Sequence, residues 1–218
     1  MEVILIVLGI ASFIGAIIFV THWFERKRRE ELRQVADELG LAYYPDGSAD
    51  LTAKLGNFAL FNLGRGRNQA KLIQGASDDV TISIFDYRYT TGSGKHSQTH
   101  QQTVAALCSA DLKIPEFTLR PEYMWDKIGS LIGMSDINFD SHPTFSKMFV
   151  LKSNNETAVR KFFKPPILEF FENHQGVSVE AKRGALIFYR PGRRVAPGDI
   201  KQFLTHAYEI YGVMVDHL

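Results

Sequence analysis

The first 24 residues carry an unbroken apolar stretch that sets them apart from the rest of the chain. Residues 3–20 contain no charged side chain, and residues 21–24 extend the run up to Glu25. About 20 apolar residues, at about 1.5 Å of rise each, span a hydrocarbon core of about 30 Å. The pattern therefore predicts a transmembrane anchor over residues 1–24, followed by one soluble domain over residues 25–218.

Two properties favour an uncleaved anchor over a signal peptide. Only Met1 and Glu2 precede the apolar run, so a basic leader is missing, and residues 22–25 contain no small-residue cleavage site. Basic residues follow the helix and none precedes it; they are Arg26, Lys27, Arg28, Arg29 and Arg33. The positive-inside rule then predicts a single-pass protein with its N-terminus outside and its C-terminal domain in the cytoplasm.

Short apolar segments with either strand or helix periodicity fill the rest of the chain. A helix is predicted over residues 25–39, as a continuation of the membrane helix, because Leu32, Val35, Ala36 and Leu39 recur at helical spacing. Strands are predicted over residues 41–44, 59–61, 70–75, 80–89, 99–109, 113–120, 137–139, 147–152, 177–181 and 185–190. Further helices are predicted over residues 48–55, 121–132, 153–163, 167–173 and 197–215. Strands that come in clusters indicate an α+β domain with a mainly antiparallel sheet.

The apolar pattern of the strand predicted over residues 80–89 changes face partway along. Ile82 and Ile84 alternate onto one face. Phe85, Tyr87 and Tyr89 then occupy the opposite face. Such a change predicts a bulge, or a strand that leaves the core.

Turn and cap residues add several local expectations. Loops are predicted at the glycine-rich residues 64–68 and at residues 90–98, the latter as the tip of a long hairpin. Pro115 marks its segment as an edge strand. Ser153 and Glu156 have the spacing of a capping box, which should open the following helix.

Composition and charge exclude several classes of function. The net charge is +1, so the chain has no overall field to attract nucleic acid, and it contains no nucleic-acid-binding motif. A single cysteine, Cys108, excludes an intramolecular disulfide and every zinc pattern that needs paired cysteines.

Two motifs in the predicted hairpin tip invite a ligand interpretation that their details do not support. Residues 92–95 read Gly-Ser-Gly-Lys, but a phosphate-binding loop needs glycine where Tyr89 stands and serine or threonine where His96 stands. His96 and His100 fall on one face of a strand, yet no carboxylate is fixed nearby in sequence to complete a metal site. The sequence therefore predicts no metal ligands and no cofactor-binding residues.

Asp140, Ser141 and His142 combine the three residue types of nucleophilic catalysis. Adjacent residues point apart and cannot hydrogen-bond in series, which argues against a triad. The segment is better explained as a turn, in which Asp140 or Ser141 caps the short element begun by Pro143. No catalytic residue is predicted, although a lone general base at Asp140 or His142 stays open.

Several arginines lie beside glycines in predicted loops, where such residues can hold phosphate or carboxylate; they are Arg65, Arg67, Arg190, Arg193 and Arg194. Solvated loop charge is the commoner explanation. The basic residues 26–29 could bind anionic lipid, but the glutamates among them favour a topology signal on a solvated helix.

Small residues in the membrane helix bear on oligomerisation. Ala11 and Gly15, like Ser12 and Ala16, are spaced four apart, which lets two membrane helices approach closely. The sequence thus leaves a homo-oligomer open.

Four segments of the soluble part resemble a group of uncharacterised bacterial proteins. These segments are FDYRYTTGSGKHSQTHQQTV (85–104), DINFDSHPTFSKMFVLKSNNETAVRKFF (136–163), IPEFTLRPE (114–122) and LIFYRPGRR (186–194). The resemblance implies a membrane helix with a cytoplasmic domain of unknown function in the bacterial inner membrane. It implies no reaction, cofactor or residue role.

The leading hypothesis for function is a non-enzymatic, membrane-tethered interaction module that docks a protein partner or organises itself at the inner face of the membrane. It rests on the anchor, the compact domain and the lack of a recognisable catalytic constellation. One alternative is a membrane-anchored hydrolase that uses Asp140 or His142 with loop arginines. The other is an anionic lipid-headgroup binding domain that uses residues 26–29 and nearby basic loops.

Overall fold

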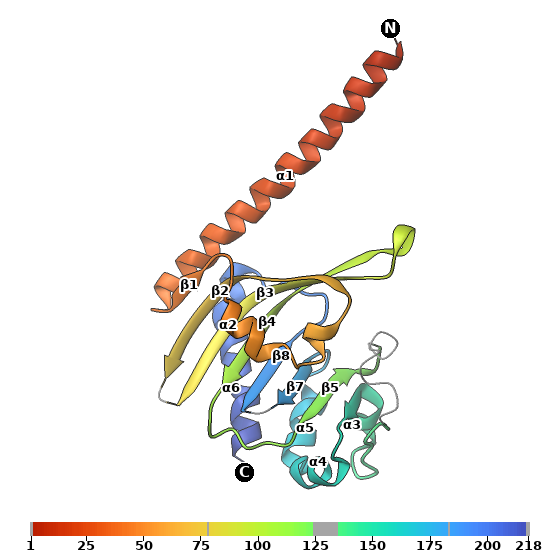
Figure 1. Ribbon diagram of the computed structural model, residues 1–218. Helices are drawn as coiled ribbons and strands as arrows, with labels where there is room; N and C mark the ends of the chain where they lie inside the picture. Colours follow the sequence, from red (N-terminus) through yellow and green to blue (C-terminus); the bar gives the residue numbers. More distant parts are fainter. Residues whose placement is uncertain (1, 78, 124–134, 183, 217–218) are drawn as a thin grey trace.

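One long helix connects the apolar N-terminal stretch to a sheet-based domain in the computed structural model, which describes residues 2–77, 79–123, 135–182 and 184–216 (Figure 1). This helix, α1 (Glu2–Glu38), is unbroken, as the sequence predicts. Ile6–Glu38 is the one described helix long and apolar enough to cross a membrane by length and composition, criteria that a signal sequence would also meet. Its large apolar side chains from Ile6 to Phe24 are exposed.

The domain is built on one sheet, whose described strands follow the order β1-β2-β3-β4-β8-β7-β5-β6. Every pair of neighbours is antiparallel. The strands are β1 (Ala42–Tyr44), β2 (Arg65–Ser77), β3 (Val80–Thr91), β4 (Gln98–Cys108), β5 (Phe117–Pro121), β6 (Phe149–Lys152), β7 (Ser178–Lys182) and β8 (Ala185–Tyr189). The α+β class predicted from the sequence is confirmed.

Helices cover both faces of this sheet (Figure 1). The α-helices after α1 are α2 (Ala49–Leu55), α3 (Pro143–Met148), α4 (Glu156–Phe162), α5 (Pro165–Asn173) and α6 (Ile200–Val215). The described residues also form three short 3-10 helices, η1 (Leu60–Asn62), η2 (Gly94–His96) and η5 (Pro197–Asp199). The end of α1 packs with α3 to α6 on a first core, whereas α2 and η1 cover a second core on the other face.

Strand β3 contributes to both cores and stays in the sheet; the bulge expected at Phe85 lies instead in the facing strand β2, whose pairing with β3 shifts register between Ala70 and Ile73. Its pairing with β4 runs without a register shift from Thr81 to Thr91. Ile84 therefore faces the first core, while Phe85 and Tyr87 face the second. The apparent change of face arises because the strand is apolar on both sides near its middle.

Five other local predictions are corrected. Residues 60–61 lie in η1, with residue 59 at its N-cap, instead of in a strand, and residues 64–68 mostly begin β2 instead of a loop. Residues 137–139 form no strand. Strand β5 lies between β7 and β6, so it is not an edge; Pro115 precedes it and disturbs no ladder. The helix after Ser153 is capped by Asn155, whose side chain accepts from the Ala158 amide.

Part of one predicted element lies outside the described residues. The helix expected over residues 121–132 falls largely on residues 124–134. Its first position, Pro121, belongs to β5 instead.

Candidate functional site

A buried ion pair fastens helix α1, just after its apolar stretch, to the sheet. The Nε and Nη2 atoms of Arg28 donate to the two carboxylate oxygens of Asp86 on β3, both over 2.8 Å. Both side chains are about nine-tenths buried. Arg28 stands one and two helical turns before Leu32 and Ala36, which are buried in the first core. Arg28, Leu32 and Ala36 thus lie on the one face of α1 that contacts the sheet. Arg28 is the charged member of this face, at the edge of the apolar core.

Neighbouring groups complete the hydrogen bonding of this pair. Arg28 also donates to the Val195 carbonyl oxygen over 2.8 Å. The hydroxyl of Thr103 on β4 donates to Asp86 over 3.1 Å and accepts from the Val195 amide over 2.9 Å. Helix α1, two strands and the segment before α6 therefore meet at one carboxylate.

A bulge in β2 brings a lysine into the same cluster. The pairing of β2 with β3 shifts register between Ala70 and Ile73, and Lys71 takes a φ of 56°, which is rare for a residue other than glycine. The buried Lys71 ammonium lies 2.7 Å from Glu25 and 3.5 Å from Asp86. The bulge thus turns the lysine toward α1, which a regular strand would not do.

Arg194 closes the cluster from the other side. It lies 2.6 Å from Glu25 and 3.8 Å from Asp86. Burial by itself would raise the pKa of Glu25, but hydrogen bonds and charges from Lys71 and Arg194 outweigh it and lower that pKa to about 2. With Arg28, three cations surround two carboxylates, so the cluster carries a net positive charge.

Acid should loosen this junction through Glu25. Its pKa in the folded protein, about 2, lies below the ordinary 4.5, so its contribution to stability is complete above 4.5 and is lost as the pH falls toward 2. We expect the thermal midpoint of the wild type to fall more steeply over that range than that of Glu25→Gln, measured on the full chain in detergent. Equal pH dependence of the two proteins would contradict the assignment.

A cleft of about 1070 Å³ opens beside the cluster, between α1 and the sheet. One wall is α1 from Thr21 to Glu31, and the other is formed by the stem of the β3–β4 hairpin, including Arg88 and Gln101. In Figure 1 the hairpin projects to the same side as the free half of α1. The cleft therefore begins where the apolar stretch ends.

Cations outnumber carboxylates on the walls of this cleft. The cationic side chains are Arg26, Lys27, Arg28, Arg29, Lys71, Arg88 and Arg194, and the carboxylates are Glu25, Glu31 and Asp86. Arg26 and Arg88 form no ion pair with the described residues. The cleft can thus accept an anionic group.

A second buried charge lies under the other face of the sheet. Glu180 on β7 is fully buried and accepts from Arg120 over 2.6 Å and from the Tyr189 hydroxyl over 3.1 Å. It also accepts from the amides of Ala59 and Leu60, at the start of η1. This carboxylate ties η1 to the sheet. The Nε and Nη1 atoms of Arg120 are buried without a hydrogen-bond partner among the described residues.

The Asp140–His142 segment is a turn, as the sequence predicts, and His142 takes the cap position of α3 in place of Asp140 or Ser141. One detail differs from expectation, because the Ser141 hydroxyl and His142 Nδ1 lie 3.0 Å apart and do hydrogen-bond. Asp140 and Ser141 are exposed and line none of the cavities described above. Among the residues that the structure describes, no buried side chain hydrogen-bonds to Asp140 or Ser141.

Three of the five loop arginines singled out in the sequence, Arg65, Arg67 and Arg194, have side-chain partners among the described residues. Arg65 donates to the Gly92 carbonyl and, over 2.8 Å, to the Ser97 hydroxyl, which links β2 to the hairpin tip. Arg67 donates to the Phe61 carbonyl over 2.6 Å. Arg194 belongs to the junction cluster, so solvated loop charge is the wrong description for it.

Residues 94–95 of the hairpin tip belong to η2, a single 3-10 turn, and β4 follows it, so the described residues place no α-helix there to bind phosphate. His100 Nε2 lies 2.8 Å from the Thr91 hydroxyl, and the His100 ring stacks on Tyr89. Burial raises the pKa of Cys108, which makes this thiol a poor nucleophile.

Sequence reasoning missed the junction cluster and a group of three side chains, His174, His206 and Glu209. A signal existed for part of the cluster, since Asp86 interrupts an apolar strand and Arg28 shares the helical stripe of Leu32. No spacing in the sequence connects His174 to α6.

Comparisons with known proteins show a likeness of fold. No protein-family model matches the sequence, so the resemblance to uncharacterised bacterial proteins has no family match behind it, and no curated protein matches. The crystal structure of the mycobacterial trehalose monomycolate transport factor A, TtfA, is similar, with a TM-score of 0.61. The match covers 87% of this chain and 95% of that chain at 11% sequence identity. At that identity the likeness concerns the fold alone.

Proposed function

We propose that residues 1–24 are an uncleaved, single-pass anchor and that residues 25–218 are a non-enzymatic module that docks a protein partner at the cytoplasmic face of the inner membrane. The observation that carries the proposal is the junction at Arg28. Because α1 continues unbroken into a buried ion pair with Asp86, no flexible linker separates the anchor from the sheet. The direction of α1 in the membrane would thus determine the orientation of the whole domain relative to the bilayer.

A rigid junction suits docking because the domain already has a fixed orientation at the membrane. Less conformational entropy is then lost when a membrane-borne partner binds. The cleft and the hairpin stem lie next to the end of the anchor, where another membrane protein would meet them. The similar fold belongs to a transport factor for trehalose monomycolate. We propose from this likeness only a role of the same broad class, that of a transport factor.

The orientation can be measured with fusions after Leu218. The basic residues after the anchor predict that a reporter active only outside the cytoplasm stays silent and that a cytoplasmic reporter is active. Strong activity of the first reporter would contradict the cytoplasmic placement.

Docking can be tested by photo-crosslinking in native membranes. A photoreactive amino acid at the exposed cleft residue Arg88 is expected to yield one stoichiometric adduct with a membrane protein, whereas the same group at exposed Lys161 on α4 should not. Adducts of equal yield from both positions, or none from Arg88, would contradict docking at the cleft. Turnover of an ester, phosphoester or peptide that Asp140→Ala or His142→Ala abolishes would establish the hydrolase alternative.

The excess of cations in the cleft favours a second candidate, binding of an anionic lipid headgroup. The full chain in nanodiscs should then unfold at a higher temperature with anionic lipid than with zwitterionic lipid. Replacing Arg26 and Arg88 by glutamine, or adding salt, should remove the difference. The same midpoint in both lipids would exclude this candidate.

A further inference from the structure

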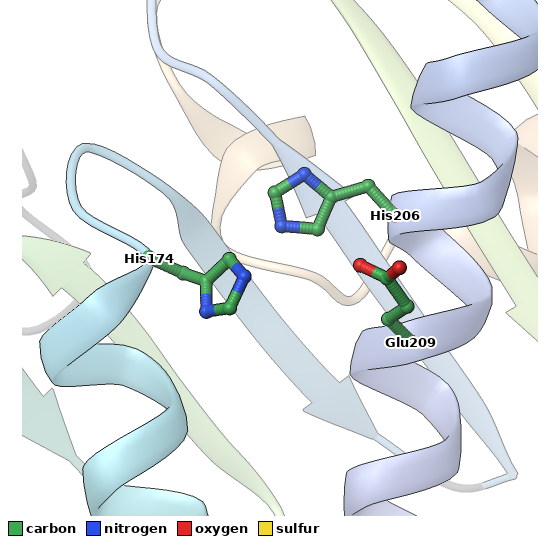
Figure 2. A group of neighbouring side chains, drawn as sticks. All are labelled: His174, His206 and Glu209. Carbon is green, nitrogen blue, oxygen red and sulfur yellow. The ribbon is translucent and has the colours of Figure 1, made fainter.

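Three side chains with metal-binding donors converge between α5 and α6, away from the membrane-side cleft. His174 lies at the end of α5, and His206 and Glu209 lie three residues apart on α6 (Figure 2). Their donor atoms all lie within 4.8 Å of one another. Figure 2 shows the three side chains pointing toward a common space.

His174 is held in the form that a metal ligand requires. Its Nδ1 atom lies 2.6 Å from the Phe170 carbonyl oxygen, which can only accept, so Nδ1 carries the hydrogen. Its Nε2 atom is then left with a free lone pair. An imidazole that donates to a backbone carbonyl while its other nitrogen binds a metal is a recurrent arrangement in metalloproteins. Stacking on the Phe170 ring, at 4.0 Å between centroids, fixes the ring further.

His206 supplies an unsatisfied nitrogen. Its Nε2 atom is buried and has no hydrogen-bond partner among the described residues. Burial lowers the pKa of His206, and the nearby Arg190 charge lowers it further. Ring packing against Phe188 explains the position of the side chain but leaves this buried nitrogen without a partner.

Glu209 provides the charge and the freedom to adjust. Its carboxylate is exposed, so it can change rotamer at little cost. Donor atoms bound to a tetrahedral zinc ion at about 2.0–2.2 Å lie about 3.3 Å from one another. The distances between the three donor atoms, at most 4.8 Å, must therefore shorten by about 1.5 Å or less. The Glu209 charge also offsets the repulsion that Arg190 exerts on a cation.

We propose that His174, His206 and Glu209 bind one divalent first-row transition-metal ion, with Zn²⁺ as the reference ion. Two imidazoles and one carboxylate are a recurrent ligand set for zinc and leave a fourth position for water or a partner group. The ion would join α5 to α6 and so connect two helices that cover the first core. This inference is independent of the proposed docking function.

The untagged full chain in detergent, stripped with a chelator, tests the site directly. Calorimetric titration with Zn²⁺ should show one equivalent, and Co²⁺ should give the visible absorption of a four-coordinate centre. At a Zn²⁺ concentration 100-fold above Kd, Tm should rise by about 5–10 °C. Absence of saturable binding to the wild type would overturn the proposal.

Matched variants locate the ion. Glu209→Gln and His174→Ala should each weaken Zn²⁺ binding at least about tenfold, since changes outside the ligand shell already cost that much. Glu169→Gln, an exposed carboxylate on α5, and His142→Ala should bind as the wild type does. Unchanged affinity in both ligand variants would place the ion elsewhere and overturn the assignment.

Discussion

Glu180→Ala should lower the free energy of unfolding by about 3–5 kcal/mol, because it leaves the buried Arg120 guanidinium without its counter-charge. The carboxylate also accepts from two amides of the segment that enters η1 and from Tyr189. Its loss therefore frees donors that water cannot reach. The change is measured by chemical denaturation of the full chain in detergent, followed by near-UV circular dichroism.

Two variants make this test specific. Glu180→Gln keeps an acceptor oxygen and should lose less stability than the alanine variant. Glu156→Gln removes an exposed pair with Arg160 on α4 and should change the free energy of unfolding by less than about 1 kcal/mol. A Glu180→Ala protein as stable as Glu156→Gln would show that the buried cluster is not what holds η1 to the sheet.

Asp86→Ala should have an effect of similar size, about 3–5 kcal/mol, because the buried Arg28 guanidinium would lose its paired carboxylate, whereas Lys71 keeps Glu25 at 2.7 Å. Its effect should concentrate at the junction. We expect amide hydrogen exchange in α1 after Arg28 to accelerate well beyond exchange in β7 and β8.

The matched control for Asp86 is Asp46→Asn. Asp46 pairs with Arg29 of α1 over 3.7 Å, but the Asp46 side chain is 87% exposed. Asp46→Asn should therefore lower the free energy of unfolding by no more than about 0.5 kcal/mol. If Asp86→Ala and Asp46→Asn affected exchange in α1 equally, the buried pair would not be the attachment of the anchor.

The sequence predicts the fold well where periodicity is strong. Helix α1, the β3–β4 hairpin and helix α6 follow directly from apolar spacing, as does the antiparallel sheet. Prediction from the sequence fails where tertiary contacts determine the local structure. Residues 64–68 carry two glycines, yet they mostly join β2, because the hairpin beside them offers a strand partner that local propensity cannot reveal.

The site escaped prediction for a related reason. Asp86, Lys71 and Arg28 are far apart in sequence, and each has an ordinary local explanation as a surface charge. Only the bulge at Lys71 and the docking of α1 turn them into one buried cluster. His174 meets His206 and Glu209 because α5 and α6 pack on the same core, which no spacing in the sequence encodes.

The central claim, that α1 is a membrane span rigidly continuous with a cleft at the bilayer surface, is tested most directly by depth measurement. Spin labels are placed at Ala16, Arg88 or Lys161 in a chain whose buried Cys108 is replaced by alanine, in nanodiscs, and collision with oxygen is compared with collision with an aqueous nickel reagent. We predict that Ala16 lies in the hydrocarbon core, Arg88 at the headgroup level and Lys161 in bulk water. Nickel access at Ala16, or equal access at Arg88 and Lys161, would contradict the account.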